Sequence, residues 1–359
     1  MPEKTIIITG VAGLVGTASA AYFTAIGFTV VGIDNNLRQK FFGKDADTNK
    51  TSEHTLSNLP NFSLLSDDIR DEKAMNDIFA QHADGLVAVI HCAAQPSHDW
   101  AAREPLTDFS INASGTLILL EATRRFAPQA SFVFMSTNKV YGAKPNDLTY
   151  AEEELRWSPT NSEIETYGFD EDLGIDMTTH SIFGVSKASA DLMVQEYGRY
   201  FGLNTVCLRG GCLTGPLHAG AELHGFLSYL VKCAVHKRPY VIFGYQGKQV
   251  RDNIHTDDLV RAIQCYLDDP EPAMVYNIGG GPDNTTSILE AIESIKSINP
   301  NYSLEYSVNS ENRIGDHIWY VSDLRRFKLR YPHWAPEISI QQILEEMVAT
   351  EEKVLGVAD

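Results

Sequence analysis

Residues 5–16, TIIITGVAGLVG, decide how the first part of the chain folds. A short run of β-branched residues predicts a buried strand, and Gly10, Gly13 and Gly16 follow it at the head of a small-residue helical pattern that ends at Gly27. Glycines there allow a tight turn, close approach of the backbone to a pyrophosphate, and close packing of helix on strand, while the helix N-terminus supplies positive potential. The stretch therefore predicts a dinucleotide-binding turn; the alternative is a glycine-rich turn that binds nothing.

A carboxylate at the end of the second expected strand supports the dinucleotide interpretation. Asp34 closes the run TVVGID (29–34), at about the 20-residue offset where an acid takes the ribose hydroxyls. Because a carboxylate there would repel a 2′-phosphate, it favours NAD over NADP, a preference that the nearby Arg38 and Lys40 weaken slightly. Three neighbours complete this part of the expected cofactor site: Leu14, Val15 and Asn35.

Continuous apolar strands alternate with helical patterns through the first 211 residues. That order predicts a parallel sheet covered by helices on both faces, which is a Rossmann-like doubly wound α/β fold. Further strands are expected at 86–94, 131–137 and 204–211, and the longer helices at 115–126 and 184–202.

The rhythm loosens beyond about residue 213, which predicts a smaller C-terminal α/β lobe for the substrate. We expect an NAD-binding domain over 1–205 and a mainly substrate-binding lobe over 206–359, with some segments interleaved. Residues 40–60 and 143–180 are polar and lack periodicity, so we expect long irregular loops there, of the kind that are usually functional or flexible.

Composition excludes several classes of protein. The 359 residues are 43% hydrophobic and 21% charged, as in ordinary globular proteins, and the net charge of −18 argues against wholesale binding to nucleic acid or an anionic membrane. No apolar run approaches the ~18–20 residues that span a bilayer, and the chain enters its first strand at once, so we expect a cytoplasmic protein. The cysteines form no Cys-x-x-Cys pair and no histidine cluster has zinc-like spacing, which predicts a reduced compartment and no structural metal.

Several segments together carry a family resemblance. They are DDIRD (67–71), HCAAQ (91–95), INASGT (111–116), MSTNKVYG (135–142), Lys187 and RDNIHTDDL (251–259). With the glycines, they resemble the extended short-chain dehydrogenase/reductase family of nucleotide-sugar epimerases and dehydratases over nearly the whole chain. Within that family STNKVYG, QPS and GLNTVCLRGG are most similar to the CDP-paratose (CDP-tyvelose) 2-epimerases. The resemblance implies NAD as cofactor, a nucleotide-diphosphate sugar as substrate, and a homodimer.

The resemblance also implies cofactor contacts, residue by residue. Asp68 and Ile69 would flank the adenine, and Lys187 would bind the nicotinamide ribose. The path to that ribose would be lined or braced by Ala93, Ala94, Gln95, Asn112 and Ser136. Taken singly, Asn112 could instead cap the helix that begins near Gly115, and Lys187 could be an ordinary snorkelling lysine.

On the substrate side, Thr137 and Asn138 are expected to bind the substrate. Thr137 would hydrogen-bond the sugar, although it could simply end a strand. Asn138 and Lys139 stand where 4,6-dehydratases carry an Asp-Glu pair, which counts against dehydration because an amide cannot deliver a proton as a carboxylic acid does. Arginine forks would grip the diphosphate, and the alternative for any one of them is a salt bridge. The candidates are Arg209, Arg251 and Arg313.

Phe183 departs from the family pattern. In SIFGVSK (181–187) it lies four residues before Lys187, on the same helical face, where the family carries a tyrosine that takes the sugar hydroxyl proton. Another base could replace it, and the candidates are Cys212, His98, Asp99, Tyr167 and His180. We favour Cys212, because a thiol near a cationic nicotinamide should ionise more readily.

The sequence is interpreted as that of an NAD-dependent nucleotide-sugar epimerase that transiently oxidises a ring carbon, C2 being favoured. Thr137, Lys187 and Cys212 are its expected catalytic residues. The alternatives are a 4-epimerase or reductase, a Tyr-to-Phe variant made to trap substrate, or an inactive protein that binds NAD and a sugar nucleotide.

Overall fold

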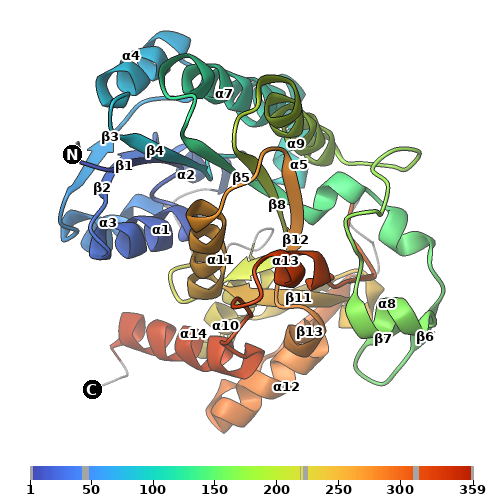
Figure 1. The fold of residues 1–359 in the computed structure, drawn as a ribbon. Helices are drawn as coiled ribbons and strands as arrows, with labels where there is room; N and C mark the ends of the chain where they lie inside the picture. The colour runs from blue at the N-terminus through green and yellow to red at the C-terminus, as the bar shows by residue number, and fades with distance from the viewer. Residues whose placement is uncertain (1–2, 43–47, 219, 221–224, 310–314, 357–359) are drawn as a thin grey trace. The chain divides into compact units, whose positions relative to one another are not determined.

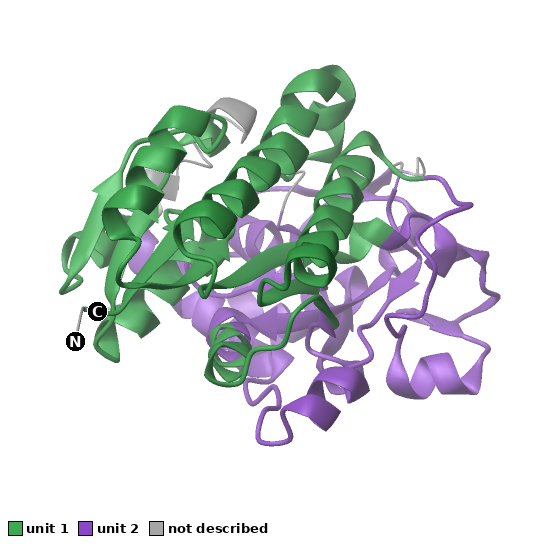
Figure 2. Cartoon of the chain, turned by 45° about the horizontal axis from the view of Figure 1, so that its top comes forward, with its two compact units in different colours: residues 1–140, 180–209, 260–276 green, residues 141–179, 210–259, 277–359 purple. Residues whose placement is uncertain are grey.

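The computed structural model describes residues 3–42, 48–218, 220, 225–309 and 315–356. They form two compact units (Figure 2). Unit 1 comprises residues 1–140, 180–209 and 260–276, and unit 2 comprises 141–179, 210–259 and 277–359. The chain therefore passes between the units repeatedly, and a single boundary after residue 205 describes this division only in outline.

Unit 1 is built on a seven-stranded sheet with the order β12-β8-β5-β4-β1-β2-β3. Pairing is parallel between β1 and β2, β2 and β3, β1 and β4, and β4 and β5. The strand order reverses between β1 and β4, and ligands of doubly wound sheets bind at the carboxyl ends of the strands at such a point. The strands are β1 (Thr5–Thr9), β2 (Thr29–Ile33), β3 (Phe62–Leu65), β4 (Leu86–His91), β5 (Ser131–Thr137), β8 (Thr205–Gly210) and β12 (Met274–Ile278).

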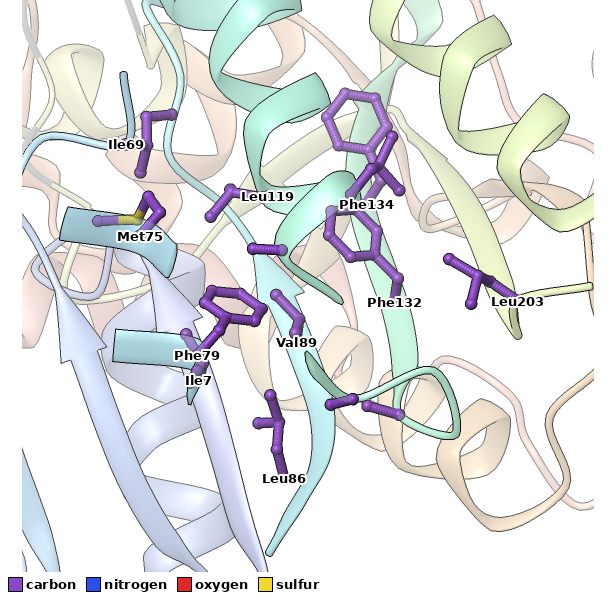
Figure 3. Close-up of a cluster of buried hydrophobic side chains, with 14 of the residues drawn as sticks. Ile7, Ile69, Met75, Phe79, Leu86, Val89, Leu119, Phe132, Phe134 and Leu203 are labelled. Carbon is purple, nitrogen blue, oxygen red and sulfur yellow. The ribbon is translucent and has the colours of Figure 1, made fainter. Parts of the chain in front are cut away.

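Helices cover both faces of this sheet, as predicted (Figure 1). One face carries α4 (Glu72–His82), α7 (Gly115–Phe126) and α9 (Ile182–Phe201), and the other carries α1 (Leu14–Ala25). Figure 3 shows the apolar layer between the sheet and the first group of helices, with Ile7 and Phe132 from strands facing Phe79 and Leu119 from helices. All four side chains are fully buried, so this layer holds α4 and α7 on the strands that carry the cofactor residues.

The prediction of an irregular loop over residues 40–60 is wrong in part, because α3 (Thr48–Ser57) lies within this range, after α2 (Leu37–Phe42). The segment is too polar to predict a helix by periodicity. However, Ser52 and Leu56 are buried and α3 packs on α1, so a tertiary contact decides the conformation. Residues 143–180 hold short elements, which include a 3-10 turn (Lys144–Asp147), β6 (Tyr150–Glu152), β7 (Trp157–Pro159) and α8 (Ser162–Tyr167).

Unit 2 combines a small sheet with a helical core. Strand β11 (Val250–His255) pairs with β9 (Cys212–Thr214), β13 (Thr285–Ser287) and β15 (Trp319–Tyr320). The core lies among α10 (Phe226–Val235), α12 (Ile288–Ile298) and α14 (Ile340–Leu355). The remaining elements are α11 (Thr256–Asp268), which runs from unit 2 into unit 1, β10 (Tyr240–Phe243), β14 (Tyr306–Asn309) and α13 (Arg325–Arg330). Among the described residues, no helix combines the length and apolarity that a membrane crossing requires.

Candidate active site

The turn after β1 leaves no room for a side chain at Gly10 or Gly16. Gly10 has φ +67°, and a Cβ there would lie 2.6 Å from the backbone nitrogen of Ala93. A Cβ on Gly16 would lie 2.3 Å from the carbonyl oxygen of Gly10. Gly13 is the N-cap of α1 and has no side chain that could cap the helix. Leu14 and Val15 are the first residues of the helix, and no side chain caps the backbone amides there. Such a turn fits a pyrophosphate, because amides and the helix dipole both favour an anion.

Asp34 is fixed beside this turn, directly after β2. Its carboxylate accepts hydrogen bonds from the backbone nitrogens of Ala12 (3.0 Å) and Asn36 (2.8 Å). Burial raises the pKa of Asp34, and the two amide donors oppose that rise. Shortly after β3, the guanidinium of Arg70 donates from Nε (2.9 Å) and Nη2 (2.6 Å) to the carboxylate of Asp68. This pair lowers the pKa of Asp68. Asn35 also hydrogen-bonds Asp68, so the predicted ribose and adenine residues lie together.

A buried hydrogen-bond network holds the loop that follows β4 and carries Ala93, Ala94 and Gln95. The Gln95 side chain accepts from the Ser97 backbone nitrogen (2.5 Å) and donates to Asp108 Oδ1 (2.7 Å). Asn112 binds both the backbone nitrogen (2.9 Å) and the backbone oxygen (3.0 Å) of Gln95. Asn112 lies inside a π-helical turn, Ser110–Ser114, that runs into α7, so it does not cap that helix. The Gln95 amide is turned into the protein, and Asn112 braces the loop.

Lys187 lies on α9 with its ammonium group inside the protein. Its Nζ donates to the carbonyl oxygen of Met135 (2.7 Å) and lies 4.0 Å from the centre of the Phe134 ring. Burial lowers the pKa of Lys187 to about 8, and the charge of Asp191 opposes that shift. A side chain that is 4% exposed cannot be snorkelling. Lys187 thus places a cation at the end of β5, the strand that ends at Thr137 and precedes the buried Asn138.

Arg209 and Ser136 take part in a second buried cluster. The guanidinium of Arg209 forks Asp191 at 3.1 and 2.8 Å, and the Ser136 hydroxyl donates to the same carboxylate at 2.5 Å. Asp191 and Arg209 are both buried. The salt bridge weighed as the alternative for Arg209 is therefore present, and it ties β8 to α9 within unit 1.

Phe183 is 7% exposed and its ring contacts a histidine. The ring centroids of Phe183 and His98 are 4.9 Å apart, with the planes at 62°. His98 begins α5 (His98–Arg103), which follows the braced loop and precedes α6 (Pro105–Phe109). His180, another candidate base, has its Nε2 at 2.8 Å from the carbonyl oxygen of Val140. Among the candidate bases, His98 is therefore in ring contact with Phe183, the residue that lacks the hydroxyl.

The other predicted residues lie in unit 2. Arg251 is buried, and its guanidinium donates to the carbonyl oxygens of Val250 (2.7 Å) and His317 (2.6 Å) and to the carboxylate of Asp316. Cys212 is half-buried on β9, opposite Asn253 of β11. Tyr167 stacks on the guanidinium of Arg325 at 4.0 Å. Arg313 lies outside the described residues.

Sequence reasoning missed three buried residues that hold the unit 1 site: Asp108, Ser186 and Asp191. Two carried a signal, since Asp108 lies four residues before Asn112 in a helical stretch and Ser186 directly precedes Lys187. Ser186 donates to the carbonyl oxygen of Phe183 (3.0 Å) and accepts from Asn112 Nδ2 (3.0 Å). The network therefore runs from the loop after β4 to the turn of α9 that holds Phe183.

Known proteins are similar to this chain over nearly its whole length. CDP-paratose 2-epimerase of Salmonella typhi is 30% identical over 349 residues, which cover 95% of this chain and 97% of that protein. UDP-glucuronate 4-epimerase of Thermodesulfobacterium geofontis is 28% identical over 95% of this chain and 94% of its own length. The crystal structure of UDP-glucuronic acid 4-epimerase from Bacillus cereus, in complex with UDP-glucuronic acid and NAD, superposes with a TM-score of 0.76 at 22% identity, covering 98% of this chain and 99% of that one.

A family model described as the NAD dependent epimerase/dehydratase family matches residues 6–279. The match covers most of the chain and includes the glycine turn, Asp34, the braced loop and Lys187. It confirms the predicted resemblance, and the chain therefore belongs to the NAD dependent epimerase/dehydratase family.

Proposed function

We propose that the protein epimerises a nucleotide-diphosphate sugar by transient, NAD-dependent oxidation of a ring carbon, with C2 favoured. The observation that carries the proposal is a complete cofactor cradle joined to a buried lysine. The glycine turn and Asp34 lie at one end of β1 and β2, and the Nζ of Lys187, which is on α9, donates to Met135 of β5 in the same sheet. The preference for C2 rests on the 30% identity to CDP-paratose 2-epimerase.

The residues of unit 1 fit NAD. The turn excludes any Cβ at Gly10 or Gly16, so a pyrophosphate can approach the backbone closely. Two backbone amides fix the carboxylate of Asp34 directly after β2. An acid there would accept two ribose hydroxyls, and its negative charge would repel a 2′-phosphate. Bound NAD would supply a nicotinamide ring that accepts and returns a hydride. Lys187 would hold the nicotinamide ribose.

Residues at the end of β5 favour epimerisation over loss of water. Thr137 would hydrogen-bond the sugar, while Asn138 and Lys139 carry no carboxyl that could protonate a leaving hydroxyl. The Thr137 hydroxyl oxygen accepts from the Lys139 backbone nitrogen (3.2 Å), which fixes its position. In unit 2, Arg251 and Arg313 would bind the diphosphate, and Cys212 stays a candidate for proton transfer.

Phe183 favours one second candidate function, an inactive protein that binds NAD and a sugar nucleotide. A phenylalanine ring cannot take a hydroxyl proton, so that protein would retain ligand binding but not turnover. The experiment below separates the two functions.

The test begins with the protein as purified. Nucleotide released on denaturation and measured by chromatography should be NAD or NADH, about one per chain, with little NADP. Protein incubated with CDP-, UDP-, GDP- and dTDP-sugars should then convert one of them to an epimer with new anomeric signals in the NMR spectrum. Bound NAD without conversion of any sugar in the panel would favour the inactive protein, and bound NADP would contradict the assignment to Asp34.

We further propose that unit 1 pairs with a second copy of the chain through α7 and α9. These helices pack side by side (Figure 1), and α9 exposes apolar side chains at helical spacing. They are Ile182, Val185, Leu192, Met193 and Tyr200, and α7 adds Leu117. A stripe of this kind is typical of an interface, because isolated surfaces rarely gather so many apolar side chains.

Replacing Leu192 with glutamate should convert the dimer into a monomer, because a charge would be buried at the centre of that stripe. Light scattering coupled to size-exclusion chromatography measures the mass directly. Leu329→Glu is the matched control, since Leu329 is exposed on α13 of unit 2 and its replacement should leave the mass unchanged. A monomeric parent protein at micromolar concentration would contradict this proposal.

A further inference from the structure

We propose that His98 accepts and returns the sugar hydroxyl proton in place of the missing tyrosine hydroxyl. The inference rests on the proposed function and assigns the proton transfer that Phe183 cannot carry out. It begins from the contact between the two rings, whose centroids are 4.9 Å apart. A tyrosine at 183 would carry its hydroxyl on this ring, so the imidazole of His98 contacts the very ring on which the family keeps its acid.

An imidazole suits this task on chemical grounds. Its ordinary pKa lies near neutrality, and its two nitrogens can accept a proton and release it again. Lys187 follows Phe183 by one turn of α9, but its Nζ donates to the Met135 carbonyl oxygen and so points at the backbone of β5. The lysine supplies positive charge there, and the proton itself needs a separate acceptor.

Buried side chains hold the backbone next to His98 and the backbone of Phe183. Ser97 caps α5, its hydroxyl accepting from the Trp100 backbone nitrogen (3.1 Å), so the position of His98 at the helix start is fixed. Gln95 grips the Ser97 backbone at both nitrogen (2.5 Å) and oxygen (2.9 Å). Asn112 then joins Gln95 to Ser186 at 3.0 Å.

From Ser186 the connection reaches the helix backbone, because its hydroxyl donates to the Phe183 carbonyl oxygen at 3.0 Å. The loop that carries His98 and the turn that carries Phe183 are thus linked through one buried network of Gln95, Asn112 and Ser186. Catalytic groups need such fixed supports to remain within reach of the reacting atoms.

The other candidate bases of unit 1 are placed less well. The Nε2 of His180 is engaged by the Val140 carbonyl oxygen at 2.8 Å. Asp99 is adjacent to His98 on α5, so its side chain points about 100° away around the helix. Among the residues that the structure describes in unit 1, His98 combines a titratable ring with the contact to Phe183.

The step balances as follows. Bound NAD would supply the oxidant, because its nicotinamide accepts the hydride that leaves the sugar carbon and later returns it to the opposite face. His98 would take the hydroxyl proton on a ring nitrogen as the carbon is oxidised to a ketone. Its imidazolium would give that proton back to the oxygen when the hydride returns, so no external oxidant would be required.

His98→Gln and His98→Ala test the assignment in the intact protein. We expect kcat to fall about 10²- to 10⁴-fold, the range for one positioned acid–base group, with the content of bound NAD and the melting temperature unchanged. Added imidazole should restore part of the activity of His98→Ala, and Phe183→Tyr in that background should restore more, because it returns a phenol beside Lys187. In the parent protein, the pH profile of kcat/KM should show an imidazole-like limb that the variants lose.

The controls separate this inference from its rivals. His82→Gln removes a histidine from α4, at a place with no assigned role, and should leave kcat unchanged. If the parent protein epimerises its sugar and His98→Gln retains full activity with bound NAD, the assignment to His98 is overturned while the proposed function stands. Loss in Cys212→Ala or His180→Gln, with His98→Gln fully active, also overturns it. A parent protein that converts no sugar overturns both.

Discussion

Replacing Gly10 with alanine should both destabilise unit 1 and remove NAD. The backbone at this position has φ +67°, where a Cβ costs about 1–2 kcal/mol. In addition, the new methyl group would lie 2.6 Å from the nitrogen and 2.8 Å from the Cα of Ala93, atoms of the backbone that cannot rotate away. We expect a further loss of about 1–3 kcal/mol from this overlap, and NAD binding at least about 100-fold weaker, since the loop after β4 must move.

Gly202 provides the matched control for this prediction. It has φ +71° at the end of α9, and a Cβ there would meet nothing within 4 Å. Gly202→Ala should therefore show the backbone penalty of about 1–2 kcal/mol alone, with NAD affinity preserved. Urea unfolding followed by circular dichroism, with and without NAD, measures both variants. If both variants lost the same free energy of unfolding, the overlap with Ala93 would not contribute to the effect at Gly10.

Replacing Arg251 with alanine should abolish most of the affinity for the sugar nucleotide. Arg251 is buried on β11 and its guanidinium is held in place by His317, Val250 and Asp316. Loss of a charge-assisted pair with a phosphate costs about 1.5–3 kcal/mol, which is a rise of about 10- to 150-fold in Kd. NAD affinity should stay unchanged, because the cofactor residues are those of unit 1. Titration calorimetry with the sugar nucleotide identified by the NMR panel gives both constants.

The stability of unit 2 must be separated from the loss of a ligand contact. Arg156→Ala is the control, because Arg156 forks Glu290 at 2.5 and 2.7 Å in the same unit and has no assigned ligand. It should lower the melting temperature while leaving the sugar-nucleotide Kd unchanged. If Arg251→Ala binds the sugar nucleotide as tightly as the parent protein, Arg251 is a structural residue held by Asp316, and the diphosphate site lies elsewhere.

Local pattern was sufficient for the doubly wound sheet and its glycine turn. Residues 5–34 alternate between a β-branched run, a small-residue helix and a second strand, and each of these periods is set by neighbours in sequence. The predicted strands at 86–94 and 131–137 contain β4 and β5, and the family resemblance is confirmed by the match over residues 6–279. The need for glycine at position 10 follows from a single backbone angle and one close approach.

Other features depend on partners that are distant in sequence, and no local pattern contains them. Helix α3 forms in a polar segment because it packs on α1. Arg209 and Arg251 look alike as candidates for a diphosphate, yet Arg209 is bound to Asp191, 18 residues earlier, and Arg251 to Asp316, 65 residues later. The charge that surrounds a side chain is set by the fold, so residue type alone could not separate the two.

The same distinction applies to the missing hydroxyl. The sequence by itself determined that Phe183 lies one helical turn before Lys187 and cannot transfer a proton, because helix periodicity and the chemistry of the ring settle both points. It offered five possible bases and no means of ranking them by position. Only the tertiary structure brings His98 against Phe183 across 85 residues, because the buried network through Gln95, Asn112 and Ser186 joins the loop after β4 to α9.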